Sequence, residues 1–198
     1  MTGFRITVDG AKETLKRLDA IPAKSRSALV MAVNDTAETI RAHVLRDITG
    51  EVNIKRQLLR ERVLLTRATR GRISARVWAL KKGLVLSHFP HKQLWTKGKG
   101  GKRRRAGVQV NVSGRTSVLP GAFIVALAGS GKTDGLIFIR TGKRSKEERG
   151  GGLSRSKIEA LYGPSPSQIL NTHLPDYTAE GERLLNANVR RQLERAKL

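Results

Sequence analysis

The sequence predicts an α+β fold: an antiparallel β-sheet with a long N-terminal helix packed on it, and a C-terminal helix. Three observations predict it. Near the N-terminus, apolar residues recur at three- and four-residue steps over a long stretch, the middle of the chain holds several short runs of alternating apolar and polar residues, and a second helical pattern ends the chain. Strands grouped between helices are typical of an antiparallel sheet with helices packed on it.

The first elements are a strand and two helices. Residues 4–8 alternate apolar and polar side chains and end at Asp9-Gly10, which predicts a short strand. A short helix is expected over residues 11–19, and it stops before Pro22. The strongest helix runs from residue 23 to about residue 47 and ends by Gly50. Its apolar stripe consists of Leu29, Val33, Thr36, Ala37, Ile40, Val44 and Ile48.

The middle of the chain is rich in strands. A basic helical turn or two over residues 54–60 precedes two strands split by Arg70-Gly71. The second of these strands carries apolar residues on one face and basic or polar residues, Arg72 and Arg76 among them, on the other. The predicted strands are residues 63–69, 72–80 and 107–113, and a hairpin of 122–127 with 136–140.

The last element is a helix over residues 175–198, with Leu184, Leu185, Val189 and Leu193 as its buried edge. Two segments, at about 88–106 and 141–157, are expected to be flexible basic loops because they are polar, rich in glycine and without periodicity. A chain of 198 residues is long enough for one sizeable core, so a single domain over residues 1–198 is expected.

The net charge of +23 is the strongest global signal, and the charge is unevenly spread. Between Arg62 and Lys132 the chain holds sixteen lysines and arginines and no aspartate or glutamate. Such a basic middle predicts contact with nucleic acid or with an acidic protein, and the alternative is a charged surface that only keeps the protein soluble.

The most concentrated charge lies in residues 97–105. Cations at this density neutralise phosphates without reading a base sequence. Trp95 lies close by in the sequence and is suited to stacking on a base, but duplex DNA exposes no base face. The alternatives are a disordered solvated loop and a basic strip paired with an acidic subunit. The candidate DNA or acidic-partner contacts are Lys97, Lys99, Lys102, Arg103, Arg104, Arg105, Arg72 and Arg76.

Other chemistry finds little support in the sequence. The absence of cysteine excludes thiolate metal sites and cysteine nucleophiles, and no apolar run approaches the ~20 residues that cross a bilayer. Residues 126–133 end in Gly-Lys-Thr like a phosphate-binding loop, but Ala126 replaces the first glycine and a strand follows where a helix is required. His88 and His91 have no further metal ligand near them. We therefore expect no catalytic residue, no metal, no cofactor and no enzyme activity.

A series of motifs resembles the phage minor tail protein Z family over residues 10–198. A basic helical segment is followed by strands, a Lys/Arg-rich loop, a Leu-Pro-Gly-Ala-Phe-Ile motif and a hairpin that closes on arginine. Their order carries the resemblance more than any single motif does. The matching segments are residues 54–62, 64–69, 72–80, 114–115, 119–124, 138–140 and 158–165.

The resemblance implies a structural virion protein of a tailed phage that completes the tail at its head-proximal end and takes part in head-tail joining. It implies contacts with other tail and neck proteins, a homo-oligomeric ring that matches the six-fold symmetry of the tail, and assembly in the host cytoplasm. The rival interpretation is a general nucleic-acid-binding protein of ribosomal or architectural type, which explains the charge but not the motif series. The motif expected to form core and turn consists of Leu119, Pro120, Gly121, Ala122, Phe123 and Ile124.

Overall fold

The computed structural model describes residues 2–7, 23–98, 100–125, 135–141 and 158–196. The chain forms two compact units. The first unit consists of Met1–Gly50, Arg56–Lys82 and Ser165–Leu198, and the second of Glu51–Lys55 and Gly83–Pro164. The fold class is α+β, as the sequence predicts. Whether the two units fold together as one domain stays a prediction.

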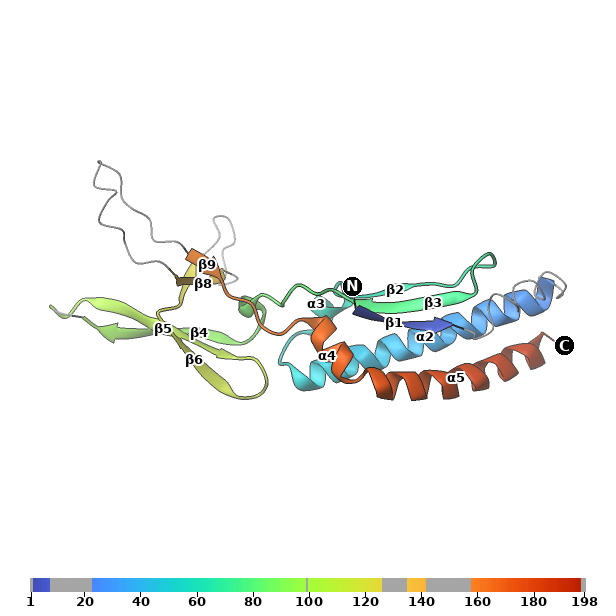
Figure 1. Ribbon diagram of the computed structural model, residues 1–198. Helices are drawn as coiled ribbons and strands as arrows, with labels where there is room; N and C mark the ends of the chain where they lie inside the picture. The colour runs from blue at the N-terminus through green and yellow to red at the C-terminus, as the bar shows by residue number, and fades with distance from the viewer. Residues whose placement is uncertain (1, 8–22, 99, 126–134, 142–157, 197–198) are drawn as a thin grey trace, which may run out of the picture. The chain divides into compact units, whose positions relative to one another are not determined.

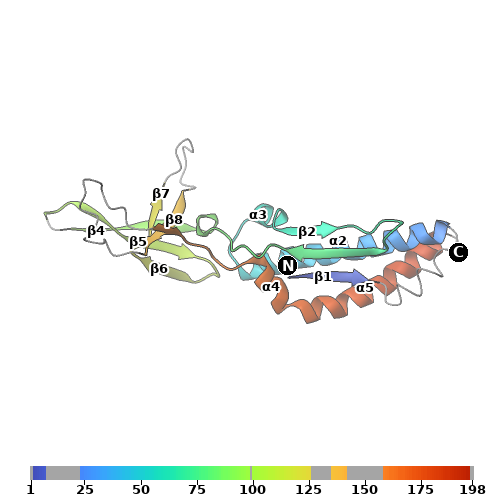
Figure 2. The same ribbon diagram turned by 45° about the horizontal axis from the view of Figure 1, so that its top comes forward.

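The described part of the first unit contains a three-stranded antiparallel sheet and four helices. The strands are β1 (Thr2–Thr7), β2 (Val63–Thr66) and β3 (Ser74–Ala79), in the order β1-β3-β2. The helices are α2 (Ala23–Glu51), α3 (Arg56–Arg60), α4 (Pro166–Thr172) and α5 (Leu174–Arg195). Helix α2 runs the length of the sheet, and α5 lies alongside α2 (Figures 1 and 2).

The core of the first unit lies between α2 and the sheet. The predicted apolar stripe of α2 is buried, except for the half-buried Leu29. Strand β3 alternates as its sequence predicts, with Ala75, Val77 and Ala79 buried. Asn34 of α2 fixes the chain after β2, because its side chain accepts a hydrogen bond from the Ala68 amide (2.8 Å) and donates one to the Ala68 carbonyl (3.2 Å).

The interface between α2 and α5 is polar. Asn188 donates to the hydroxyl of Thr36 (2.9 Å), Gln192 donates to Asp35 (2.8 Å), and the hydroxyl of Tyr177 donates to Asp47 (2.9 Å). The buried residues of α5 are Tyr177, Gly181, Asn188 and Gln192. The expectation that Leu184, Leu185, Val189 and Leu193 form the buried edge is therefore wrong, since all four are only half-buried. Side chains that bond to α2 occupy the buried edge instead.

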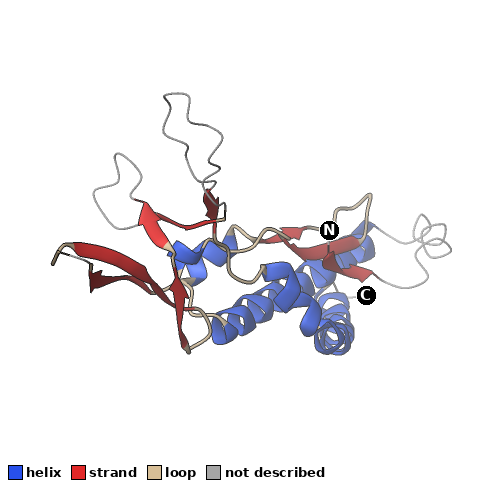
Figure 3. Ribbon diagram, turned by 60° about the vertical axis from the view of Figure 1, so that its left-hand side comes forward, coloured by secondary structure: helices blue, strands red, loops and turns tan. Residues whose placement is uncertain are grey.

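The second unit contains two three-stranded antiparallel sheets, with strand orders β4-β5-β6 and β7-β8-β9. Among the described residues, the elements that lie wholly within this unit are strands, apart from the 3-10 helix η1 (Leu86–His88) (Figure 3). They are β4 (His91–Lys97), β5 (Arg103–Asn111), β6 (Thr116–Pro120), β7 (Phe123–Val125), β8 (Leu136–Arg140) and β9 (Ile158–Ala160).

A small core and one bridging side chain hold the two sheets of this unit together. Val108 and Val110 of β5 and Ile137 of β8 are buried. Gln93 of β4 donates to the Gly107 carbonyl (2.7 Å) and accepts from the Ile124 amide of β7 (3.0 Å). A polar side chain thus joins the first sheet to the second.

The prediction that residues 88–106 form a loop is wrong. Residues 91–97 and 103–106 are strand, and the chain turns between them at residues 100 and 101. Antiparallel pairing with a neighbouring strand satisfies the backbone hydrogen bonds here, which a count of polar and glycine residues does not reveal. Three other predicted segments lie outside the described residues: the helix over 11–19, most of the turn that resembles a phosphate-binding loop, and nearly all of the loop over 141–157.

Candidate nucleic-acid interface

The candidate site is the end of the β4–β5 hairpin, residues 95–98 and 100–105, which we call the basic ribbon. Trp95 pairs with Arg105, Thr96 with Arg104, and Lys97 with Arg103. Residues opposite each other in an antiparallel pair share a face, so Lys97, Arg103 and Arg105 share a face with Trp95, and Arg104 lies on the other. Strand β6 pairs only with residues 107–111 of β5, so the ribbon is two-stranded.

Glycines shape both ends of the ribbon. At the tip, Gly98 accepts from the Gly101 amide (3.1 Å) and donates to the Lys102 carbonyl (2.9 Å), and Gly100 and Gly101 have φ angles of 82° and 75°. At the base, the register shifts between Leu94 and Trp95, which leaves Ala106 unpaired as a β-bulge. The bulge turns the ribbon's side chains relative to those of the sheet behind it.

Cations of the ribbon lie over aromatic rings. The guanidinium carbon of Arg103 lies 4.5 Å from the centre of the Trp95 ring, which is 44% exposed. The guanidinium of Arg105 lies 5.7 Å from the centre of the Phe123 ring, and that of Arg140 lies 5.0 Å from the same ring. Such contacts order the side chains while leaving their charge intact. The sequence places Trp95 near this charge, but it gives no signal that Phe123 and Arg140 belong to the same cluster.

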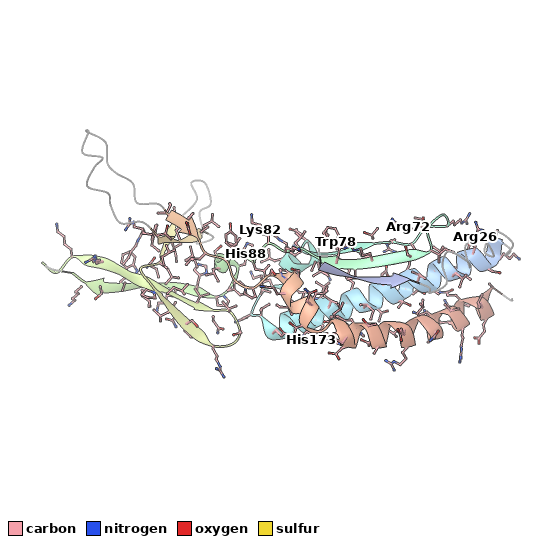
Figure 4. The ribbon with its side chains drawn as sticks, in the orientation of Figure 1. Arg26, Arg72, Trp78, Lys82, His88 and His173 are labelled. Atoms are coloured by element: carbon pink, nitrogen blue, oxygen red, sulfur yellow. The ribbon has the colours of Figure 1, made fainter. Side chains whose placement is uncertain are left out.

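The structure does not place all the predicted contact residues in one compact unit. Lys97, Lys102, Arg103, Arg104 and Arg105 lie in the ribbon and are exposed, and Lys99 lies outside the described residues. Arg72 and Arg76 belong to the first unit. Arg72 is exposed at the end of the β2–β3 hairpin, and Trp78 lies further along β3 (Figure 4). Arg76 is half-buried on β3.

The motif expected to form core and turn spans the connection between β6 and β7. Leu119 and Pro120 end β6, and Gly121 makes the turn with a φ angle of 75°. Ala122 and Phe123 are buried, with 1% and 8% of their surface exposed, and Ile124 is half-buried in β7. The motif thus supplies one strand end, one turn and part of the core of the second unit.

The described residues contain no group of three or more side chains suited to hold a metal ion. Nδ1 of His91 donates to the Phe89 carbonyl (2.9 Å), so the chain itself uses this nitrogen. Among the described helices, none is long and apolar enough to cross a membrane. One carboxylate oxygen of Glu180 lies 2.9 Å from Nδ1 of His43, and the other lies 3.9 Å from Nη2 of Arg183.

The fold is α+β, and its basic ribbon presents exposed lysines and arginines. The family model of prophage minor tail protein Z (GPZ) matches residues 8–196. The chain therefore belongs to this family of phage minor tail proteins, which are structural components of the tail. Searches of curated proteins and of solved structures gave no match.

Proposed function

We propose that this protein completes the tail at its head-proximal end, takes part in head-tail joining, and contacts the end of the genome through the basic ribbon. Family membership supports a place in the tail. The observation that carries the DNA contact is the ribbon itself, which presents Lys97, Arg103 and Arg105 on one face and no carboxylate. Tail and neck proteins are its other expected partners.

The geometry of the ribbon suits the DNA backbone. Side chains two residues apart on a strand are separated by roughly 7 Å, which corresponds to about two charges along one DNA strand. A two-stranded ribbon is narrow enough to enter the major groove of B-DNA. Because the cations contact phosphates and read no bases, binding is expected to be independent of sequence. A protein that meets whichever genome end enters the tail needs this property.

The DNA contact is tested by the salt dependence of binding to a short duplex. Each phosphate contact contributes about 0.9 to the slope of log K against log salt, so Lys97→Gln, Arg103→Gln and Arg105→Gln together should lower the slope by about 2.7. Between about 50 and 200 mM salt, the wild-type protein should then lose about 40-fold more affinity than the triple variant. Fluorescence anisotropy with a labelled duplex measures both slopes.

The matched control changes three exposed arginines of α5 to glutamine, Arg183, Arg190 and Arg195. This variant carries the same net charge as the ribbon variant. If both variants lower the slope of log K against log salt by the same amount, the binding reflects net charge alone, and the ribbon is not the DNA contact.

The position in the particle is tested separately, by electron microscopy of phages that carry a tagged copy of the protein. Label at the junction of head and tail is expected, and label at the distal tip of the tail or in the capsid shell would contradict the proposal.

A homo-oligomeric ring of six copies belongs to the same proposal. A ring of such basic subunits needs DNA or acidic neighbours to offset its self-repulsion, and native mass spectrometry of the assembled form gives the number of copies.

The second candidate is a general nucleic-acid-binding protein, which the net charge of +23 favours. Both candidates bind DNA in the salt-dependent manner described above. Only the tail-completion protein is required for assembly, so a deletion of its gene should give heads and tails that fail to join. Normal particle yield after the deletion would favour the general binding protein.

A further inference from the structure

A second basic site lies in the first unit, in a surface hollow of about 330 Å³ between α2, α3 and the edge strand β2. We call it the arginine hollow. Its lining consists of four arginines, one carboxylate and three apolar residues: Arg41, Arg56, Arg60, Arg67, Glu38, Ala42, Leu45 and Leu65. The sequence shows a basic helical turn here, but the arginines come from three separate segments that only the fold brings together.

The four arginines differ in what holds them. Arg41 donates to the carbonyls of Val63 and Arg60, each at 3.0 Å, and thereby ties α2 to α3 and β2. Arg67 forms an ion pair with Glu38. Arg56 and Arg60 are exposed on α3, one helical turn apart, and neither pairs with a carboxylate in the described part of the chain. These two guanidinium groups therefore have their charge available to a partner.

The apolar surface of the hollow comes mainly from the exposed Ala42 and from Leu65. Leu45 is 4% exposed, and Leu65 is half-buried. Apolar residues flanked by guanidinium groups match a protein segment whose apolar side chain lies next to carboxylates, because arginine binds carboxylate in a bidentate fork. Nucleic acid brings phosphates to such a site but no aliphatic side chain.

We propose that the arginine hollow binds an acidic segment of a neighbouring tail or neck protein, with an apolar side chain against Ala42 and Leu65 and carboxylates on Arg56 and Arg60. A second copy of this chain is a poor occupant, because a chain with a net charge of +23 is repelled by copies of itself. The inference goes beyond the DNA contact of the ribbon and does not depend on it.

The test uses a labelled synthetic peptide in which leucines alternate with pairs of glutamates. Fluorescence anisotropy should show that the wild-type chain binds it more tightly than peptides with glutamine in place of glutamate or with serine in place of leucine. Arg56→Gln with Arg60→Gln should weaken binding by about tenfold, as expected for two guanidinium–carboxylate contacts at an exposed site. The control pair, Arg190→Gln with Arg195→Gln, makes the same change of charge on α5 and should leave affinity within about twofold.

A second variant tests the hollow without altering any charge. Ala42 is exposed on the lining, so Ala42→Phe should fill the space and weaken binding, whereas Ala187→Phe on the exposed face of α5 should not. Full affinity of Ala42→Phe, or equal losses for the two arginine pairs, would overturn the proposal. Binding of a duplex DNA is measured with the same two variants. If Arg56→Gln with Arg60→Gln weakens DNA binding as much as it weakens peptide binding, the hollow is a nucleic-acid site and the proposal is overturned.

Discussion

The buried hydrogen bond between Thr36 of α2 and Asn188 of α5 gives a quantitative test of the polar interface. Thr36 is fully buried, and its hydroxyl donates to the Ala32 carbonyl (2.8 Å) while accepting from Asn188 (2.9 Å). Thr36→Val keeps the shape but leaves the Asn188 amide without an acceptor, which costs about 2 kcal/mol of unfolding free energy. Asn188→Leu leaves the Thr36 hydroxyl bonded to Ala32 and should cost only about 1 kcal/mol.

The two changes together should cost about 1 kcal/mol, less than Thr36→Val alone, because replacing both partners of a buried hydrogen bond by apolar groups leaves no buried group without a partner. The expected coupling is therefore about 2 kcal/mol, measured by urea unfolding of the four proteins of the cycle. Thr36→Val alone should lower the melting temperature by about 4–8 °C. Thr39→Val is the control, since the Thr39 hydroxyl also donates to a backbone carbonyl within α2, that of Asp35 (2.9 Å). Additive costs, or equal costs for Thr36→Val and Thr39→Val, would refute the reasoning.

Two further changes test the geometry of the remaining elements, both by chemical denaturation. Gly107→Ala should lower the free energy of unfolding by at least about 2 kcal/mol, because φ is 145° and the new Cβ would lie 2.6 Å from the Leu119 carbonyl oxygen. Gly114→Ala is the control, with φ of 77° and no atom within 4 Å of the new Cβ, and should lower it by only about 1 kcal/mol. Ser165→Ala should cost about 1 kcal/mol by removing the capping box with Gln168 at the start of α4, whereas Ser165→Asn should retain most of that stability.

The elements with a strong periodic pattern could be predicted from the sequence. Helix α2 follows its stripe of small and branched residues, because a long amphipathic pattern admits one buried face. The hairpin of β2 and β3 forms at Arg70-Gly71, where the amides and carbonyls of Thr69 and Arg72 bond to each other (2.9 and 3.0 Å). In both cases local sequence and tertiary packing favour the same conformation.

The ribbon and the buried edge of α5 could not be predicted, for two different reasons. Thr96, Lys97 and Arg104 have no apolar alternation, so their strands depend on pairing with each other. On α5, the leucines suggested a buried edge, but hydrogen bonds to α2 select Asn188 and Gln192. A hydropathy pattern carries no information about which polar residues find a partner.

Only part of the candidate site could be predicted from the sequence. The density of charge along the chain identified Lys97 and Arg103 as candidate contacts, but it did not predict that they lie in strands. For the arginine hollow, the sequence showed only the basic helical turn of Arg56 and Arg60, since Arg41 is separated from it by the end of α2. Charge that is contiguous in sequence is visible before folding, whereas charge gathered by the fold is not.

The two units balance their charge differently, and this difference bears on which partners they need. In the first unit, Asp35, Glu38 and Glu180 each pair with an arginine of the same unit. In the described part of the second unit, the only carboxylates are Glu51 and Glu159, against the lysines and arginines of the ribbon and its neighbours. A unit with so few acids must find its counter-charge outside itself. We therefore expect the second unit to depend on DNA or an acidic neighbour for a stable place in the tail, and the first unit to contribute one local contact through the arginine hollow.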